Sequence, residues 1–510
     1  MKITSVTLTN FRGYKGSHTI NFDDLTVIVG NNDVGKSTIL EALDLFFNNG
    51  KGSVGFEPED INVFCGEAEY SITVTFSDLP EEVIIDSTNK TSLESEYLLN
   101  SNHELEVKRI SNGSKWTKTY ILCFAPTNPN CAELILKKNN ELKRIVTSNN
   151  IDCDTQTTNA VMRKAIWDYY TDDLQLSNIE VDTSKGDDFK SLFENLTKLF
   201  PTYALFQSDR KNNDGDKEIQ DPLQLAVTTI LKDPEIVEAL ELIANRVETS
   251  LKEVSSRTLE HLRDIDSDIA STLNPYIPST TSLKWSSVFK SVSLTADDAI
   301  PVHKRGSGVR RLILISFFKA EAERINQEGN SNGIIYAIEE PETSQHYENR
   351  LLLAKTLIDL SSKENTQVVI TTHSGAMVKL FHFDNIRLVQ KSDDNNLFVS
   401  RIDANALTYP SLNEVNFLAF GVISTEYFDE LYSFIESEGH MQQYEDGKPS
   451  YNYRWINRNG VESSALHTKT HIIRDQIHHP ENTLNVKYSQ DELVDAINDM
   501  RVFIINLQGE

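Results

Sequence analysis

Positive charge is scarce in this 510-residue chain, which has 49 lysines and arginines against 76 aspartates and glutamates and a net charge of −27. A nucleic-acid coat protein or a membrane-surface protein needs a broad basic field, so the charge balance argues against both classes. Hydrophobic runs are short, and none approaches the roughly 18–20 residues of a membrane span, which argues against a membrane partner. The first residues alternate like a strand and have no signal-peptide core.

Cysteine is limited to Cys65, Cys123, Cys131 and Cys153, and no two of them have the C-x-x-C spacing. Without an export signal, they are expected to be reduced thiols of a cytoplasmic protein. The hydrophobic content of 39% and the charged content of 25% are those of an ordinary globular protein. The length predicts roughly two to four domains.

The most specific motif is a glycine-rich turn between a predicted strand over 25–29 and a predicted amphipathic helix over 37–47. It fits the pattern G-x-x-x-x-G-K-[ST], in which backbone N–H groups at a helix N-terminus wrap phosphates. Lys36 is expected to reach the β- and γ-phosphates of ATP, and Ser37 to bind Mg²⁺. The predicted nucleotide-binding residues here are Gly30, Asn31, Asn32, Asp33, Val34, Gly35, Lys36, Ser37 and Thr38.

Two more predicted strands end in residues suited to this chemistry. Glu339 and Glu340 follow a buried strand, where carboxylates need a charged partner such as a magnesium–nucleotide complex. We assign Glu339 to the metal shell, through water, and Glu340 to orienting the attacking water. His373 follows a strand over 367–370, and a histidine at the carboxyl end of a strand faces a ligand in the crevice. The predicted catalytic residues are Lys36, Glu340 and His373.

A basic island over 303–311 interrupts the acidic sequence, and its glycines would let backbone donors approach a phosphate. The alternative is a solvated basic turn. The order and spacing of these four pieces resemble an ATP-binding-cassette ATPase of the SMC/RecF type, in the branch that includes the overcoming-lysogeny nucleases. The segments Leu8–Tyr14 and Glu339–Glu342 are typical of that group, although Glu339 replaces the more common aspartate.

The resemblance, which covers residues 1 to about 400, implies an α/β ABC-type P-loop ATPase with a long helical insertion and a mainly helical C-terminal domain. It also implies that two chains sandwich ATP and that His373 contacts the γ-phosphate. Residues of the basic island would then face the phosphate loop of the other chain, namely Arg305, Ser307 and Gly308. The signature is reduced to Gly306–Gly308 and Asp60 is a weak stand-in for the Q-loop glutamine, which favours slow hydrolysis or ATP used as a clamp.

Apolar spacing predicts a long amphipathic helix over 236–269, and a hairpin is expected over 386–402. Ser489 and Glu492 predict a capping box at the start of the last helix. The predicted domains are an ATPase lobe with the phosphate loop over 1–150, a helical insertion or arm over 151–290, a second ATPase lobe over 291–405, and a helical partner-docking or effector domain over 406–510.

Four of the 12 histidines lie between His467 and His479. Arg474 and His478 are spaced to share a helix face, and Arg474 with His479 fits the R-x4-H pattern of HEPN ribonucleases. In those enzymes the two side chains stabilise a phosphate and move protons. The alternative is a helix end stopped by Pro480, with a structural or partner-docking role. Arg474, His478 and His479 are therefore candidate effector or docking residues, and the lack of a D-x-D pattern in this region argues against a Toprim nuclease.

This ATPase with its RD-x-x-HHPEN tail resembles the stand-alone ATPases of bacterial anti-phage operons, namely the Septu ATPase, its retron-associated relatives and the ATPase of the PARIS system. The resemblance implies a homo-oligomeric sensor and scaffold that controls a separate nuclease, an HNH protein in Septu and a Toprim-like protein in PARIS. A retron-associated protein would add a reverse transcriptase with structured nucleic acid. Two alternatives stay open, a self-contained HEPN-like ribonuclease and a RecF/SMC-type DNA-repair ATPase, which the net charge disfavours.

Overall fold

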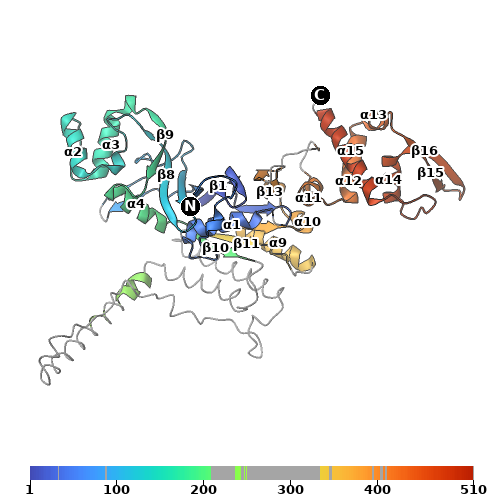
Figure 1. Cartoon of the computed structure of the whole chain (residues 1–510), viewed down its shortest axis with the longest axis horizontal. Coiled ribbons are helices and arrows are strands. Elements are labelled where there is room, and N and C mark those ends of the chain that lie inside the picture. Colours follow the sequence, from blue (N-terminus) through green and yellow to red (C-terminus); the bar gives the residue numbers. More distant parts are fainter. Residues whose placement is uncertain are drawn as a thin grey trace, which may run out of the picture. The chain divides into compact units, whose positions relative to one another are not determined.

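The fold is seen in a computed structural model (Figure 1), which describes residues 1–32, 34–86, 89–207, 236–242, 246, 249, 333–343, 347–392, 396–401, 406–407 and 411–508. The chain divides into two units, one formed by Met1–Ser208 with Asn330–Glu510 and the other by Asp209–Gly329. The first unit contains the glycine-rich loop and also Glu339, Glu340 and His373. Asp33, the basic island and most of the predicted long helix lie outside the described residues.

An antiparallel sheet of six strands, in the order β2-β1-β4-β7-β8-β9, forms one layer of the first unit. Burial alternates along β7, where Leu105, Val107 and Arg109 are buried, as in a strand with one covered face. The central strand β4 is instead buried at all but its last residue. The six strands are β1 (Lys2–Phe11), β2 (Tyr14–Asn21), β4 (Tyr70–Ser77), β7 (Leu105–Ser111), β8 (Trp116–Pro126) and β9 (Leu176–Asp182).

A second six-stranded sheet has the order β10-β11-β12-β3-β13-β14, and all its pairs are parallel except β13 with β14. Its central strands are buried throughout, which explains their continuous Val and Ile content. The last pair confirms the predicted hairpin. The strands are β3 (Leu25–Val29), β10 (Thr202–Phe206), β11 (Ile334–Glu339), β12 (Thr366–Thr372), β13 (Ile386–Lys391) and β14 (Leu397–Arg401).

Helix α1 (Lys36–Asn48) joins the two sheets. Its buried Ile39, Leu40 and Leu43 belong to one hydrophobic core with side chains of both sheets, such as Val6 and Val369. The helix α9 (Tyr347–Ser361) packs against β12 and β3. The remaining elements before the C-terminal region are α2 (Asn139–Ser148), α3 (Asn159–Tyr169), α4 (Asp187–Lys198), α10 (Gly375–Val378), β5 (Val83–Asp86), β6 (Asn89–Thr91) and the 3-10 helices η1 (Pro58–Asp60), η2 (Leu134–Leu136), η3 (Thr171–Asp173) and η8 (Phe383–Asn385).

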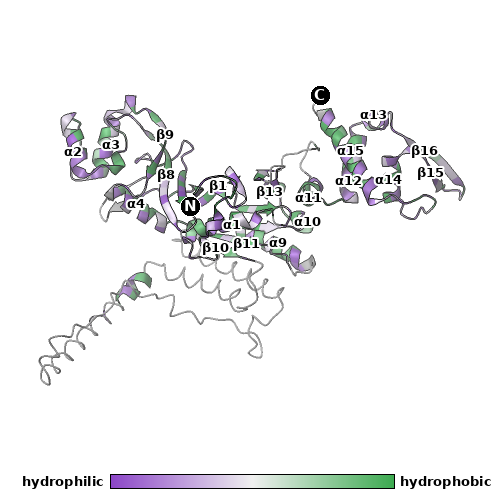
Figure 2. Cartoon of the chain, viewed as in Figure 1, coloured by the Kyte–Doolittle hydropathy of each residue, from purple (hydrophilic) through white to green (hydrophobic). Residues whose placement is uncertain are grey.

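The C-terminal region has its own core, formed by helices with one apolar stripe each; Figure 2 shows hydrophobic and hydrophilic residues side by side on α12, α14 and α15. The capping box is confirmed, because the Ser489 and Glu492 side chains each accept a hydrogen bond from the other residue's backbone N–H. A two-stranded hairpin completes the region. The elements are α11 (Leu412–Phe420), α12 (Thr425–Ser437), α13 (Met441–Glu445), β15 (Ser450–Ile456), β16 (Glu462–Thr468), α14 (Lys469–His478) and α15 (Gln490–Gln508).

No helix in the described part of the chain combines the length and apolarity that crossing a bilayer requires. Several buried arginines of the described residues are paired with carboxylates. The guanidinium of Arg163 on α3 is fully buried and makes two hydrogen bonds with Glu96, at 2.7 and 2.9 Å, and a third with Asp188 at 3.0 Å. Such a bidentate pair fixes α3 against the segment that carries Glu96.

The buried Arg163–Glu96 pair generates a stability prediction. Arg163→Met leaves the Glu96 carboxylate buried without its main partner, and we expect a loss of about 3–5 kcal/mol in unfolding free energy. Adding Glu96→Leu should recover most of that loss, since no unpaired charge is then buried. Urea unfolding followed by circular dichroism measures both effects. Lys108→Met, which breaks the exposed pair with Glu180, is the control and should cost no more than about 1 kcal/mol. An equal loss of unfolding free energy in Arg163→Met and Lys108→Met would contradict the prediction.

Candidate functional site

The parallel sheet gathers the predicted nucleotide residues at one edge. Strand β12 pairs with β3 through Thr372 and Val29, and with β11 through Thr371 and Glu339. Because the carboxyl ends of parallel strands meet at the same edge, the residues that follow these three strands become neighbours. The structure therefore brings Gly30, Glu340 and His373 to one edge of the sheet.

The glycine-rich loop is shaped by its second glycine. Gly35 has a left-handed backbone, with φ 83°, and stands directly before α1. This backbone conformation favours glycine, and a Cβ at this position would also lie 2.5 Å from Leu397 Cδ1. The hydroxyl of Tyr14 donates a hydrogen bond to the Gly35 carbonyl at 3.1 Å. With no side chain at the helix cap, the first-turn N–H groups of α1 are the donors that this loop offers to a phosphate.

Lys36 lies over the loop. Its buried side chain extends back so that Nζ donates to the carbonyls of Gly30, at 3.0 Å, and Asn31, at 2.7 Å. Ser37 is exposed and Thr38 is half-buried at the start of α1. A phosphate and its Mg²⁺ are bound by an ammonium group, a helix N-terminus and an exposed hydroxyl. These residues supply all three and so fit the predicted nucleotide. The other predicted residues of the loop that the structure describes are Asn32, which is exposed, and Val34, which is half-buried.

Glu340 and His373 form a pair. His373 Nδ1 lies 2.8 Å from Glu340 Oε1, and both side chains are partly exposed. Glu340 has a positive φ of 42°, and its backbone N–H donates to the Thr371 carbonyl at 3.0 Å. A left-handed glutamate is strained by about 1–3 kcal/mol, which is typical of residues held for a function. Glu339, one residue earlier in β11, is buried.

Glu342 was not among the predicted residues, yet the structure buries it beside this pair. The Thr372 hydroxyl donates to Glu342 Oε1, and among the described residues Glu342 Oε2 has no hydrogen-bond partner. Burial raises the pKa of the Glu342 carboxyl. Its place in the acidic run after β11 was the only signal, and the sequence does not tell a buried carboxyl from an exposed one there.

Asp60 has a structural role in the described part of the chain. It is buried, accepts a hydrogen bond from Arg12 Nε at 2.9 Å and a second from the Glu57 backbone N–H at 3.0 Å. Arg12 also pairs with Glu41 on α1. These contacts fasten the start of the chain to α1, so Asp60 has its carboxylate oxygens engaged and is a poor stand-in for a Q-loop glutamine.

The three C-terminal candidates have separate partners. The Arg474 guanidinium lies 5.6 Å from the Tyr432 ring centroid and 3.3 Å from Asp475. His478 Nε2 contacts Asp429 of α12 at 3.2 Å. His479 Nδ1 lies 3.2 Å from Glu481. Arg474 and His479 thus each contact a different acidic residue rather than each other.

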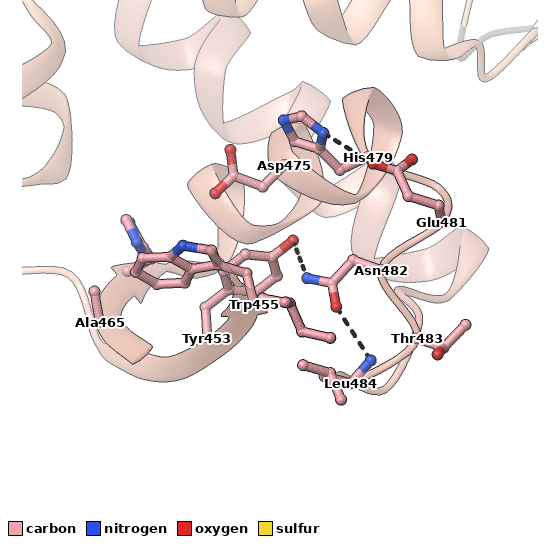
Figure 3. A pocket seen from close by; sticks show the side chains of 11 residues that line it. Tyr453, Trp455, Ala465, Asp475, His479, Glu481, Asn482, Thr483 and Leu484 are labelled. Carbon is pink, nitrogen blue, oxygen red and sulfur yellow. Dashed lines mark hydrogen bonds and ion pairs between the residues drawn. The ribbon is translucent and has the colours of Figure 1, made fainter. Parts of the chain in front are cut away.

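A cavity of about 620 Å³ opens beside His479, between the hairpin and the end of α14 (Figure 3). Aromatic and polar side chains line it, among them Tyr453, Trp455 and Asn482. His467 lines the same cavity, and burial together with the neighbouring His471 lowers the pKa of its imidazole. The sequence drew attention to this region through its histidines but gave no sign of a cavity.

The contact between Gly35 and Leu397 generates a prediction for the loop. Gly35→Ala forces a side chain into the left-handed position and against Leu397, and we expect ATP affinity to fall roughly 5- to 150-fold, the equivalent of about 1–3 kcal/mol of strain. Gly16→Ala is the matched control, since Gly16 also has a positive φ of 76° but open space where the Cβ would lie. Binding of a fluorescent ATP analogue measures both, and equal affinities would contradict the role given to Gly35.

The chain is similar to several known proteins. The profile of the AAA ATPase domain family matches residues 1–378. An OLD nuclease of Thermus scotoductus is 28% identical over 107 residues. The match spans 21% of this chain and 19% of that protein. The SMC head domain from Thermotoga maritima is 10% identical with a TM-score of 0.31, covering 79% of this chain and 100% of that chain. The Smc head from Pyrococcus furiosus with an extended coiled coil, bound to the C-terminal domain of ScpA, is 13% identical with a TM-score of 0.35, covering 79% and 96%. Since the family profile matches more than half of its residues, the chain belongs to the AAA ATPase domain family.

Proposed function

We propose that this chain binds ATP with Mg²⁺, hydrolyses it, and serves as the sensor and scaffold subunit of a bacterial anti-phage defence complex of the SMC/RecF-like, overcoming-lysogeny branch. In this proposal the chain assembles as a homo-oligomer and controls a separate nuclease. The observation that carries the ATPase part is the convergence of the glycine-rich loop with the Glu340–His373 pair at one sheet edge.

The residues of that edge divide the chemistry between them. Lys36 and the N-terminus of α1 would hold the phosphates, and Ser37 with Glu339 would hold Mg²⁺, which supplies neutralisation of phosphate charge when bound. Glu340 is placed to accept a hydrogen bond from the attacking water and so to orient it. His373 holds that carboxylate through Nδ1 at 2.8 Å, which leaves Nε2 for the γ-phosphate.

Completion of the site by a second chain is part of the proposal. It rests on the resemblance of the sequence to ATPases in which two chains enclose the nucleotide. Arg305, Ser307 and Gly308 would reach the phosphate loop of the partner copy. The reduced signature favours slow turnover, so ATP binding itself would hold the two copies together.

A pair of substitutions tests the ATPase. Glu340→Gln keeps the shape of the side chain but removes the charge that orients water, and we expect ATP to stay bound while hydrolysis falls about 10²–10⁴-fold. Lys36→Ala should instead abolish binding. Phosphate release and nucleotide binding are measured on the same preparations, and light scattering reports whether ATP holds Glu340→Gln in a larger assembly. Glu364→Gln, at an exposed position, is the control; hydrolysis at the wild-type rate by Glu340→Gln would remove the assignment.

The contact between α10 and α11 supports control of a partner through the C-terminal region. Asn416 of α11 donates to the Gly375 carbonyl of α10 at 3.2 Å, two residues after His373. In the same helix α11, Glu414 is buried and accepts from Arg501 of α15 at 2.9 Å and from the Tyr427 hydroxyl at 3.1 Å. A chain of direct contacts therefore runs from the nucleotide edge to the C-terminal core.

The hairpin β15–β16 is the surface we assign to the nuclease. Several large apolar side chains there are exposed, with Leu466 at 72% and Ile456 at 64%. Large apolar side chains left exposed on one short element are candidates for burial by a partner. The net charge of −27 would favour a partner with a basic surface.

Co-purification from the native operon tests the partner. We expect a stoichiometric nuclease of the HNH or Toprim-like kind to accompany the tagged chain, with a reverse transcriptase and structured nucleic acid if the operon is a retron. Leu466→Asp should lose that protein and keep ATPase activity, whereas Leu352→Asp, at a comparably exposed leucine of α9, should keep both. A homo-oligomer with no second protein would contradict the proposal.

A second candidate function follows from the position of His479 on the cavity. The chain could then carry its own HEPN-like ribonuclease, with His479 moving a proton and Arg474 stabilising a phosphate. Cleavage of RNA by the purified chain alone, lost in Arg474→Ala and His479→Ala, would favour this candidate over the sensor and scaffold.

A further inference from the structure

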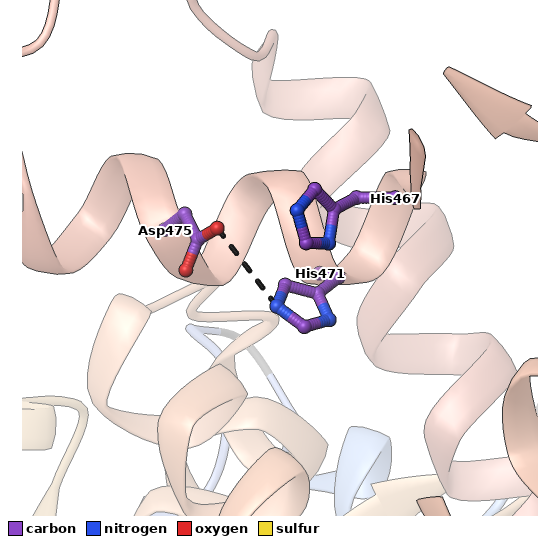
Figure 4. Close-up of side chains that lie close together, drawn as sticks. All are labelled: His467, His471 and Asp475. Carbon is purple, nitrogen blue, oxygen red and sulfur yellow. Dashed lines mark ion pairs between the residues drawn. The ribbon is translucent and has the colours of Figure 1, made fainter. Parts of the chain in front are cut away.

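Three side chains of the C-terminal region lie together in a way that the nucleotide site does not explain. His467 is the second-last residue of β16, and His471 and Asp475 lie on α14 (Figure 4). Each of the three comes four residues after the one before. Each offers one ligand atom, and these atoms all lie within 4.8 Å of one another. The two imidazole rings have centroids 4.2 Å apart, and His471 Nε2 lies 3.8 Å from Asp475 Oδ2. All three residues are half-buried.

A fourth residue orients the central histidine. Glu445 Oε1 lies 3.5 Å from His471 Nδ1, on the opposite side of the ring from Asp475. Glu445 is itself held by the Thr468 hydroxyl, which donates to it at 2.8 Å. A histidine that binds a metal usually gives its other ring N–H to a carboxylate, which fixes the tautomer and points the free nitrogen at the ion. The Glu445 carboxylate lies beside His471 Nδ1 in this way, which leaves Nε2 for an ion.

We propose that His467, His471 and Asp475 bind a divalent transition-metal ion, with Zn²⁺ as the best match, and that Glu445 is the positioning residue. Two imidazole nitrogens with one carboxylate suit zinc, whereas Mg²⁺ prefers a shell of oxygen atoms. The site is therefore chemically distinct from the nucleotide edge, where the donors are a hydroxyl and carboxylates.

Three protein ligands leave a coordination position for another group, as in zinc sites that bind or activate a ligand. His467 and Asp475 both line the 620 Å³ cavity, so this position is reached from the cavity. Water, or an oxygen or nitrogen atom of a bound molecule, would fill it. The aromatic rings of Tyr453 and Trp455 on the hairpin give the same cavity a wall for a flat, apolar group.

The competing explanation is an ion pair without metal. A protonated His471 between Glu445 and Asp475 would satisfy both carboxylates. That explanation accounts for His471 and the two carboxylates but not for His467, whose ring centroid lies 4.2 Å from that of His471. Metal binding uses all four residues, and the two explanations differ in what a metal titration shows.

Cobalt titration of the full chain, after treatment with a chelator, is the test. We expect one Co²⁺ per chain with visible d–d absorption, displaced by Zn²⁺. His467→Ala and Asp475→Asn should abolish the signal, and Glu445→Gln should weaken affinity about 10–100-fold. His478→Ala, on the same helix but paired with Asp429, and His373→Ala, at the nucleotide edge, are the controls and should bind cobalt like the wild type.

Asp475→Asn preserves the shape of the side chain, so its loss of cobalt would not come from misfolding, and circular dichroism verifies this. Absence of stoichiometric cobalt binding by the wild type would overturn the proposal. Retention of the signal in His467→Ala or Asp475→Asn would overturn it equally. The result is independent of ATP hydrolysis, so failure of the proposed ATPase and failure of the metal site are distinguishable.

Discussion

The parallel pairing of β12 with both β3 and β11 is the constraint on which the nucleotide edge depends. Val29 lies opposite Thr372, and Glu339 lies opposite Thr371, although more than three hundred residues separate β3 from the other two strands. Side chains alternate between the two faces of a strand, so a slip of one residue would turn each terminal side chain to the other face. Every residue of β3 and β12 is buried, so a slip would move side chains of one size and polarity into places packed for another.

Local patterns made much of this edge predictable. The glycine-rich loop, the buried strands before Glu339 and His373, and the capping box at Ser489 each lie within a few residues of chain, and in each the residue types themselves impose the backbone or the burial. The family match and the geometry agree with the predicted P-loop ATPase fold. The roles of Glu340 and His373 in hydrolysis are still predictions, since the structure establishes only that the two side chains meet.

The contacts that the sequence did not reveal join distant segments. Asp60 was considered a weak stand-in for the Q-loop glutamine, but it lies in the 3-10 helix η1 and its partner Arg12 lies in the turn between β1 and β2, and no motif in either segment indicates the pair. The spacing of His467 and His471 is visible in the sequence, yet it falls across the boundary between β16 and α14, where a helical period is not expected. Glu445, on the earlier helix α13, comes into reach only because the C-terminal core folds.

Several of the scarce cations are buried, and each of these has a hydrogen-bond acceptor beside it. Arg163, Arg387 and Arg501 are buried and paired with acidic residues, and buried Arg109 donates to the Phe46 carbonyl near the end of α1, where burial lowers its pKa to about 10. Buried carboxylates such as Glu96 and Glu414 are enclosed with them, so the described surface keeps the acidic balance of the composition. A net charge of this sign repels other polyanions over long range and matters for association rather than for the fold.

Movement of the nucleotide edge is expected to be transmitted to the C-terminal core, because α10 and α11 are tightly packed against each other. Gly375 comes two residues after His373, and a Cβ there would lie only 3.0 Å from Asn416 Oδ1, so α10 and α11 are in close contact. Glu414, two residues before Asn416, is buried with Arg501 and Tyr427, and moving it would break charged hydrogen bonds in a low-dielectric core. Packed elements of this kind shift as units rather than deform. We infer that a change in the position of His373 would displace α11 together with the core that holds it, and not the loop alone.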